Sequence, residues 1–299
     1  MAPLPGQLHI ISPKPLTVFE FGPPASSPLS PLVLFVAGLN DTLGSVPYLP
    51  LLSQRLEQIG WRLVQVCLTS AGAGWGGTSV KQDAEELGDV VRYFRERGSA
   101  KMVLLGHSTG CQDAIAYAHL SSRHPSSIPP LDAIILQAPV SDREWPAIAS
   151  LVSTTQHLLS RETDLDPDAF VPPSWSQLFG TGAGVTYRRW ISLALPAPSD
   201  KVNLGESEDF FSSDLSDARL ANVFGAVECP LLIALSGADE TYPYEVKANL
   251  PNLLQRFRRA AEDRWSGLSR IVEGAAHNLA DEKHAGEFAS AVVEFLRVV

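Results

Sequence analysis

A serine flanked by glycines is the strongest candidate for chemistry in this chain. It lies within residues 106–110, which read Gly-His-Ser-Thr-Gly, between a strand-like run at 101–105 and a helix-like run at 111–120. A Gly-x-Ser-x-Gly sequence at a strand-to-helix turn is typical of a nucleophile elbow, where a tight, strained turn exposes the serine hydroxyl at the end of the strand. The two glycines let the strand and the helix pack closely. We therefore predict that Ser108 is a nucleophile.

A serine hydroxyl is a weak nucleophile and needs an adjacent base. In folds that carry such an elbow, the partners follow in the order serine, acid, histidine. Asp239 follows the apolar run 231–235, and His277 follows the weaker strand candidate 269–272 in a loop of small residues. Both would lie at the carboxyl ends of strands, where such sheets place their sites. We expect His277 to take the proton of the serine and Asp239 to hold the histidine's tautomer.

Each assignment has an alternative. Ser108 could be a small turn residue, and Glu240 stands next to Asp239 as a second acid. The other six histidines lie in the first strand, in the elbow itself, or in helices and at their ends. His277 is the one histidine that follows a late strand within a loop of small residues.

The oxyanion of an acyl-transfer reaction needs two backbone N–H donors. One should come from Thr109, the residue after the nucleophile. The other should come from the loop after the strand-like run 32–37, where we choose Leu39 because Gly38 gives the backbone room to approach. The predicted substrate-pocket residues are Asn40, Trp75 and His107. The alternative for Asn40 is a turn-forming role, and the alternative for Trp75 is simple packing.

Strand-like runs alternate with helical ones along most of the chain. This order favours a mostly parallel central sheet with helices on both faces. Together with the nucleophile elbow, it predicts the α/β-hydrolase fold. The clearest helix is expected over 79–97, where Ser79 and Gln82 form a capping-box start and Gly98 a stop. A second helix is expected over 281–297. The expected strands cover 8–11, 16–21, 32–37, 63–68, 102–105, 133–136, 231–235 and 269–272.

One part of the chain interrupts the alternation. Between 138 and 227 no strong strand appears, whereas helical pieces at 144–159 and 213–224 are separated by prolines. Because the strand pattern resumes afterwards, we expect one hydrolase domain over 1–299 with a helical lid inserted at 143–226. A separate small domain is the alternative.

Composition narrows the class of protein. The chain has 299 residues and a net charge of −10, which argues against nucleic acids and anionic membranes as partners. No apolar run approaches the ~20 residues that cross a bilayer. The start of the chain lacks a signal-peptide pattern, and Cys67, Cys111 and Cys229 lie far apart. We expect reduced thiols in a cytoplasmic protein, with no metal site and no cofactor.

Five stretches together resemble one eukaryotic α/β-hydrolase family, long catalogued as a domain of unknown function. The extended elbow through Cys-Gln-Asp at 111–113 is the most specific of them. The five stretches are 35–39, 76–79 with 82–83, 106–113, 236–240 and 274–278. The family includes the fungal fusarinine C siderophore esterases, which open the ester bonds of iron-loaded siderophores inside the cell. The resemblance implies that Ser108, Asp239 and His277 are catalytic, and that iron arrives with a ferric siderophore substrate.

The resemblance leaves the substrate open, because the lid carries no recognisable motif. Fusarinine C carries free amines, so we hypothesise that acidic residues of the lid line the mouth of the site and favour an amine-bearing ester. These residues are Glu162, Asp164, Asp166, Asp168, Glu206, Glu208 and Asp209. A carboxylester or lactone hydrolase acting on another secondary metabolite is the alternative, and a non-catalytic binding protein on the same fold is an alternative of another class.

Overall fold

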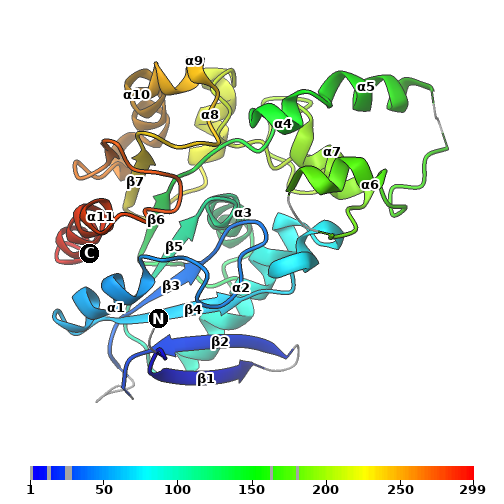
Figure 1. The fold of residues 1–299 in the computed structure, drawn as a ribbon. Coiled ribbons are helices and arrows are strands. Elements are labelled where there is room, and N and C mark those ends of the chain that lie inside the picture. The colour runs from blue at the N-terminus through cyan, green and yellow to red at the C-terminus, as the bar shows by residue number, and fades with distance from the viewer. Residues whose placement is uncertain (1–2, 12–14, 24–28, 162–163, 180–181) are drawn as a thin grey trace.

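The computed structural model describes residues 3–11, 15–23, 29–161, 164–179 and 182–299. Within these residues eight strands form one sheet in the order β1-β2-β4-β3-β5-β6-β7-β8 (Figure 1). The strands from β3 to β8 run parallel to one another, while β1 and β2 form an antiparallel hairpin and β2 pairs antiparallel with β4. Their bounds are β1 Gly6–Ile11, β2 Leu16–Phe21, β3 Leu32–Val36, β4 Arg62–Cys67, β5 Met102–His107, β6 Ala133–Gln137, β7 Leu231–Ser236 and β8 Arg270–Val272.

Helices cover both faces of the sheet. Because side chains alternate along a strand, β3 sends Leu34 into the apolar layer beneath α2, α3, α8 and α10, and Phe35 into the layer beneath α1 and α11. Both side chains are fully buried. The helix bounds are α1 Leu49–Glu57, α2 Val80–Glu96, α3 Gly110–Arg123, α8 Asp217–Phe224, α9 Tyr244–Lys247, α10 Leu250–Ala261 and α11 Glu282–Leu296, with short 3-10 turns at η1 Gly72–Gly77 and η3 Glu262–Arg264. The predicted mostly parallel sheet with helices on both faces is confirmed.

The start of α2 shows one half of the predicted capping box, because the Gln82 side chain donates to Glu86 and not back to Ser79. The Ser79 hydroxyl accepts a hydrogen bond from the backbone N–H of Gln82 at 3.2 Å. Gly98, just after the helix, has φ +93°, a backbone conformation that glycine adopts at little cost. The prediction for this helix is correct to within one residue at each end.

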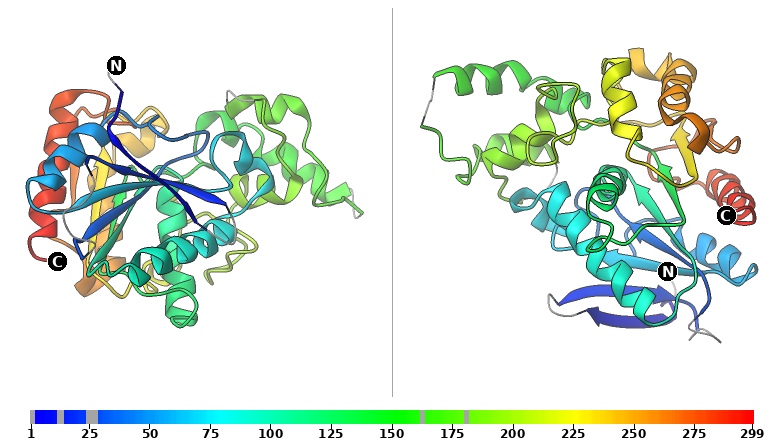
Figure 2. Two further views of the ribbon diagram at one scale, coloured as in Figure 1. Left: turned by 90° about the horizontal axis from the view of Figure 1, so that it is seen from below. Right: turned by 180° about the vertical axis from the view of Figure 1, so that it is seen from behind.

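The segment between β6 and β7 is helical, and we call residues 143–226 the inserted segment. It contains α4 Pro146–Ala149, α5 Val152–Arg161, α6 Pro173–Ser176, η2 Gln177–Phe179, α7 Tyr187–Ala194 and α8. Helices α4 to α7 lie together at the end of the molecule away from α1 and α11 (Figures 1 and 2). They share a small apolar core of their own, which Trp75 of η1 joins.

Two helix predictions in this segment began too early. The expected helix at 144–159 is two helices, and the first begins only at Pro146, because the residue before a proline disfavours helical geometry. The expected helix at 213–224 begins at Asp217. Ser216 caps it by accepting from the Arg219 N–H at 2.9 Å, which leaves the preceding residues outside the helix.

Candidate active site

Ser108 lies at the sharp turn between β5 and α3. Its backbone has φ +54°, a strained conformation for a residue with a side chain. A Cβ atom at Gly106 would lie 2.2 Å from the carbonyl oxygen of Gly110, and one at Gly110 would lie 2.3 Å from that of Val36. Only glycine fits at both positions. The close packing of strand and helix therefore holds the serine at the carboxyl end of β5.

Three side chains from different strand ends meet here. The Ser108 hydroxyl lies 2.8 Å from Nε2 of His277, and Nδ1 of His277 lies 2.7 Å from Oδ2 of Asp239. His277 follows β8 and Asp239 follows β7. Both distances are in the normal range for hydrogen bonds, so the three residues form a continuous hydrogen-bonded chain from hydroxyl to carboxylate. This is the arrangement in which an imidazole can take the proton of a serine.

The charges of His277 and Asp239 stabilise this arrangement. Burial disfavours the imidazolium of His277, but the hydrogen bond and the charge of Asp239 outweigh it, and the pKa of His277 is raised above its ordinary value. Burial acts to raise the pKa of Asp239, yet the bonds from His277 and Thr241 lower it overall. Thr241 donates to Oδ1 of Asp239 from its backbone N–H and its hydroxyl, at 2.9 and 2.7 Å. A charged Asp239 can therefore stabilise an imidazolium.

Glu240, the alternative acid, has a different partner. Its Oε2 accepts a hydrogen bond from the backbone N–H of His277 at 3.0 Å. It therefore supports the loop, while Asp239 contacts the imidazole ring.

A buried glutamine hydrogen-bonds to the loop that carries His277. Gln137, at the end of β6, donates from Nε2 to the carbonyl oxygen of His277 and to the hydroxyl of Ser236, both at 3.2 Å. Its Oε1 hydrogen-bonds with Nδ1 of His107. Burial lowers the pKa of His107 to about 3, with the charge of His277 acting in the same direction, so His107 is neutral. Sequence reasoning missed Gln137, although its place at the end of a central strand is a usable signal.

Two backbone N–H groups lie in the loops expected to supply an oxyanion hole. In the described part of the chain, the amides of Leu39 and Thr109 donate to no other group. Gly38 lies close to the serine, since a Cβ there would be 2.7 Å from Cβ of Ser108. The amides at 39 and 109 are therefore free to serve as donors beside the nucleophile.

The serine opens into a pocket of about 150 Å³. Its wall comes from the loops after β3, β6 and β7 and from the inserted segment. The described lining residues are Leu39, Asn40, Ser108, Val140, Ser141, Asp142, Trp145, Phe179 and Thr241. Of the three predicted pocket residues, Asn40 lines it. Trp75 and His107 are outside this lining, at 1% and 2% exposure.

Trp75 contacts two of the residues that line the pocket. Its Nε1 donates to Oδ1 of Asn40 at 2.7 Å, and its ring packs edge-on against Phe179 at 4.6 Å between centroids. His107 packs beside the His277 ring at 5.0 Å. Both residues thus contact groups of the site without reaching the described wall.

The acidic residues expected at the mouth lie elsewhere wherever the structure describes them. Glu208 and Asp209 are buried in ion pairs, with Arg189 at 2.7 Å and Arg143 at 2.9 Å. Asp168 pairs with exposed Arg188. Of the rest, Asp164, Asp166 and Glu206 are exposed and outside the pocket's lining, and Glu162 lies outside the described residues. The acid that does line the pocket is Asp142, which sequence reasoning missed.

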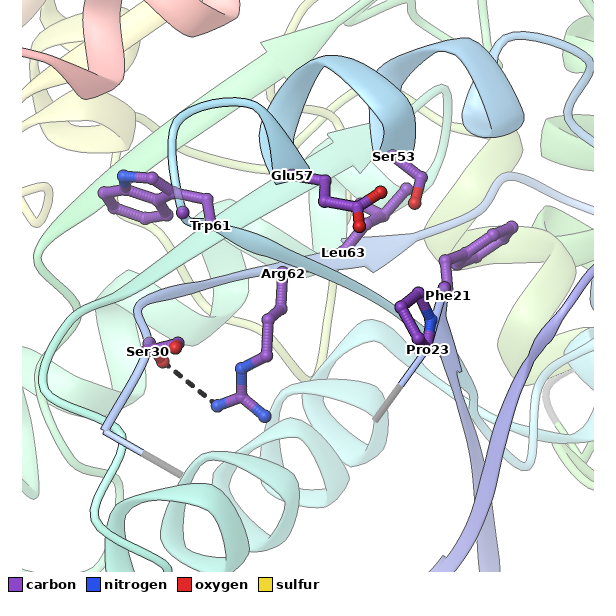
Figure 3. A pocket seen from close by; sticks show the side chains of 10 residues that line it. Phe21, Pro23, Ser30, Ser53, Glu57, Trp61, Arg62 and Leu63 are labelled. Carbon is purple, nitrogen blue, oxygen red and sulfur yellow. Dashed lines mark hydrogen bonds between the residues drawn. The ribbon is translucent and has the colours of Figure 1, made fainter. Parts of the chain in front are cut away.

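A larger hollow, of about 230 Å³, lies at the other end of the sheet (Figure 3). It is lined by Arg62 and Leu63 at the amino end of β4 and by Ser30 just before β3. Arg62 donates to the carbonyl oxygen of Ser30 at 3.0 Å and to the hydroxyl of Ser99 at 2.9 Å. The nucleophile lies at the carboxyl ends of these parallel strands, so this hollow is not part of the site.

Two other kinds of feature are absent from the residues that the structure describes. No cluster of three or more histidine, cysteine or acidic side chains there is arranged to hold a metal ion. No helix within the same ranges is both long and apolar enough to cross a membrane.

The sequence matches one protein family and several known proteins. Residues 1–297 match a family described as a protein of unknown function, DUF1749. Fusarinine C esterase sidJ of Aspergillus fumigatus is 30% identical over 94% of this chain and 92% of that protein. Esterase AN6793 of Emericella nidulans is 31% identical over 93% and 87%.

Solved structures share the fold. Siderophore hydrolase EstB from Aspergillus fumigatus has a TM-score of 0.80 and 30% identity, and the match covers 99% of this chain and 98% of that one. Est1E from Butyrivibrio proteoclasticus, with a TM-score of 0.59 and 14% identity over 98% and 97%, shares the fold alone. Two of these relatives are named as esterases and one as a siderophore hydrolase, which supports a hydrolase activity for this chain.

Proposed function

This chain belongs to the DUF1749 family of α/β-hydrolases, and from that premise we propose that it is a serine esterase acting through Ser108, His277 and Asp239. The observation that carries the proposal is the position of His277, whose ring nitrogens lie within hydrogen-bond distance of Ser108 and Asp239. This geometry is what activation of a serine requires.

The proposed reaction proceeds in two halves. Ser108 Oγ attacks the ester carbonyl carbon while its proton passes to Nε2 of His277. The backbone N–H groups of Leu39 and Thr109 donate to the oxyanion. Collapse of the intermediate breaks the ester C–O bond, and the leaving alcohol takes the proton from Nε2. Water, deprotonated by the same nitrogen, then hydrolyses the acyl-enzyme and restores the serine.

For the substrate we propose an iron-loaded siderophore of the fusarinine type. Support comes from the two relatives named for siderophore or fusarinine C hydrolysis. Trp145 and Phe179 bring the inserted segment into the wall of the pocket, and we propose that the segment acts as a lid over it. We place the reaction in the cytoplasm, where free thiols such as those of this chain stay reduced and where ester cleavage would release the iron.

A serine-directed fluorophosphonate tests whether the site is catalytic. We expect it to label the wild-type protein and Ser290→Ala, a surface serine control on α11, and not to label Ser108→Ala. If the wild-type protein stays unlabelled, the chain is a binding protein on a hydrolase fold.

Mass spectrometry tests the substrate. Ferric fusarinine C, its triacetylated form and a simple aryl ester are each incubated with the wild-type protein and with Ser108→Ala. We expect the wild-type protein to open a ferric siderophore. Cleavage of the aryl ester alone would favour a hydrolase of another secondary metabolite.

A further inference from the structure

The ester pocket contains one acid. Among the nine described residues that line it, Asp142 is the one with an ionisable side chain. Asp142 and Ser108 share a pocket of about 150 Å³. A substrate group that contacts the Asp142 carboxylate must therefore lie close to the ester carbonyl that Ser108 attacks.

The carboxylate is held in place from the elbow helix. Nε2 of Gln112, on α3, donates to Oδ2 of Asp142 at 3.1 Å and to the carbonyl oxygen of Val140 at 3.0 Å. Gln112 is 1% exposed and lies four residues after the nucleophile. Because α3 begins at the elbow, the same rigid element positions the serine and the carboxylate.

No cation of the described chain pairs with Asp142. The nearby arginines have other partners, since Arg189 pairs with Glu208 and Arg143 with Asp209. Burial raises the pKa of Asp142 to about 7; the charges of Glu208 and Asp209 act in the same direction, while Arg189 and His277 oppose them. A ligand that brings a cation would therefore stabilise the ionised form of this buried carboxylate.

The remaining wall suits a cation as well. Trp145 and Phe179 lie 5.7 Å apart between ring centroids, with their planes inclined at 57°. Aromatic faces attract alkylammonium groups through the ring quadrupole. A carboxylate and two aromatic rings are groups that together bind an ammonium ion.

We propose that Asp142, together with Trp145 and Phe179, selects esters whose acyl part carries an ammonium group close to the scissile carbonyl. The inference rests on the proposed esterase function and assigns the cation preference to one residue of the pocket. It replaces the exposed and ion-paired acids of the inserted segment in that role.

Two esters of equal shape test the proposal. Betaine ethyl ester carries a trimethylammonium group with a permanent charge, and ethyl 3,3-dimethylbutanoate has a carbon atom in place of the nitrogen. The measured quantity is the ratio of kcat/KM for the cationic ester to kcat/KM for the neutral one, because intrinsic reactivities cancel between protein variants. We expect Asp142→Asn to lower this ratio about tenfold relative to the wild-type protein, because the charge partner of the ammonium group is lost. Asp168→Asn, a surface acid control, should leave the ratio unchanged.

The pH dependence of the wild-type ratio gives a second measurement that needs no variant. The cationic ester keeps its charge at every pH, so we expect the ratio to rise between pH 6 and 8 as Asp142 ionises. Its surroundings include Glu208, Asp209, Arg189 and His277. His277 titrates as well, so the rise must flatten in Asp142→Asn if it belongs to Asp142.

The outcomes separate the two proposals. A ratio that is independent of pH, or equal in the wild-type protein and Asp142→Asn, overturns the role of Asp142 and leaves the esterase intact. If the wild-type protein hydrolyses no ester, the neutral one included, the proposed function fails and this inference fails with it.

Discussion

The side chain of Gln137 donates a hydrogen bond to the carbonyl oxygen of His277, 3.2 Å away, and so ties the loop of the candidate base to the central strand β6. Gln137→Met would keep the volume and remove this bond. Because the glutamine does not line the pocket, we expect kcat to fall about tenfold or more with little change in KM. Steady-state kinetics on a neutral ester measure both values.

A second buried glutamine provides the control. Gln65 is also 1% exposed, and its side chain hydrogen-bonds with Gly44 and Thr42, away from the histidine loop. Gln65→Met should cost a similar free energy of unfolding, on the order of 1–3 kcal/mol, with a smaller loss of kcat. Equal losses of kcat in both variants would argue against a positioning role for Gln137.

Gly38 limits how closely the loop after β3 approaches the nucleophile. Gly38→Ala places a Cβ 2.7 Å from Cβ and 3.1 Å from Oγ of Ser108, so one of the two residues must move. A displacement of the nucleophile by about 1 Å can cost on the order of 100-fold in rate, and we expect kcat/KM to fall by about this factor. In Gly77→Ala the new Cβ meets nothing within 4 Å, and this control should keep its activity.

The sequence was sufficient for the parts of the site that follow from local geometry. Ser108 could be predicted because its turn requires small flanking residues, and those glycines are visible in the sequence. Asp239 and His277 could be placed beside it because the carboxyl ends of parallel strands meet at one edge of a sheet. In each case a few neighbouring residues mark the end of a strand, and the general geometry of a parallel sheet brings the strand ends together.

The parts that depend on distant packing could not be predicted this way. Asn40 donates to the carbonyl oxygen of Phe179, 139 residues further along the chain, and no local pattern encodes that contact. Similarly, the acids of the inserted segment read as solvated or ligand-facing in the sequence. The structure instead places Glu208 in a buried pair with Arg189, because the segment folds back onto α2 and α3.

The titration of His277 should appear in the pH profile of the enzyme. The base must be neutral to accept a proton, and the pKa of His277 is raised by Asp239 against the effect of burial. We therefore expect kcat/KM on a neutral ester to rise with pH through a midpoint above 6.5 and then level off.

Asp239→Asn removes the charge that raises this pKa. The midpoint should move to lower pH, and the plateau should fall by about 10⁴-fold because the tautomer of His277 is no longer held. A midpoint that stays in place or moves upward would contradict the assignment of Asp239 as the partner of the base.

Asn40 joins the loop of Leu39 to the inserted segment. It has φ +66°, accepts from Trp75 and donates to Phe179. Asn40→Gly keeps this backbone and loses both bonds, so we expect a drop in kcat/KM of about tenfold as the pocket wall loosens. Asn40→Ala should also lose about 1–2 kcal/mol of stability, because alanine resists a left-handed backbone. Thermal unfolding and kinetics of the two variants separate the effects, and equal stability would exclude a role for the strained backbone.

The buried acids Asp83 and Asp113 make the stability of the fold fall as pH rises from 5 to 8. Burial raises the pKa of Asp83 to about 7, and burial together with the charge of Asp83 raises the pKa of Asp113 well above its ordinary value. A carboxyl whose pKa is raised on folding binds more protons in the folded protein than in the unfolded one, so its contribution to stability is lost as pH rises through the folded pKa. The wild-type protein should thus lose stability between pH 5 and pH 8.

Asp113→Asn removes one of these two titrations. Asparagine is neutral at both pH values, and Arg189 remains to balance the charge of Asp83. We expect the unfolding midpoint of the variant to fall less between pH 5 and pH 8 than that of the wild-type protein, as measured by urea denaturation. Asp168→Asn removes a carboxylate that is 70% exposed and should follow the wild-type curve. If Asp113→Asn follows the wild-type curve as well, the pH sensitivity arises from other groups.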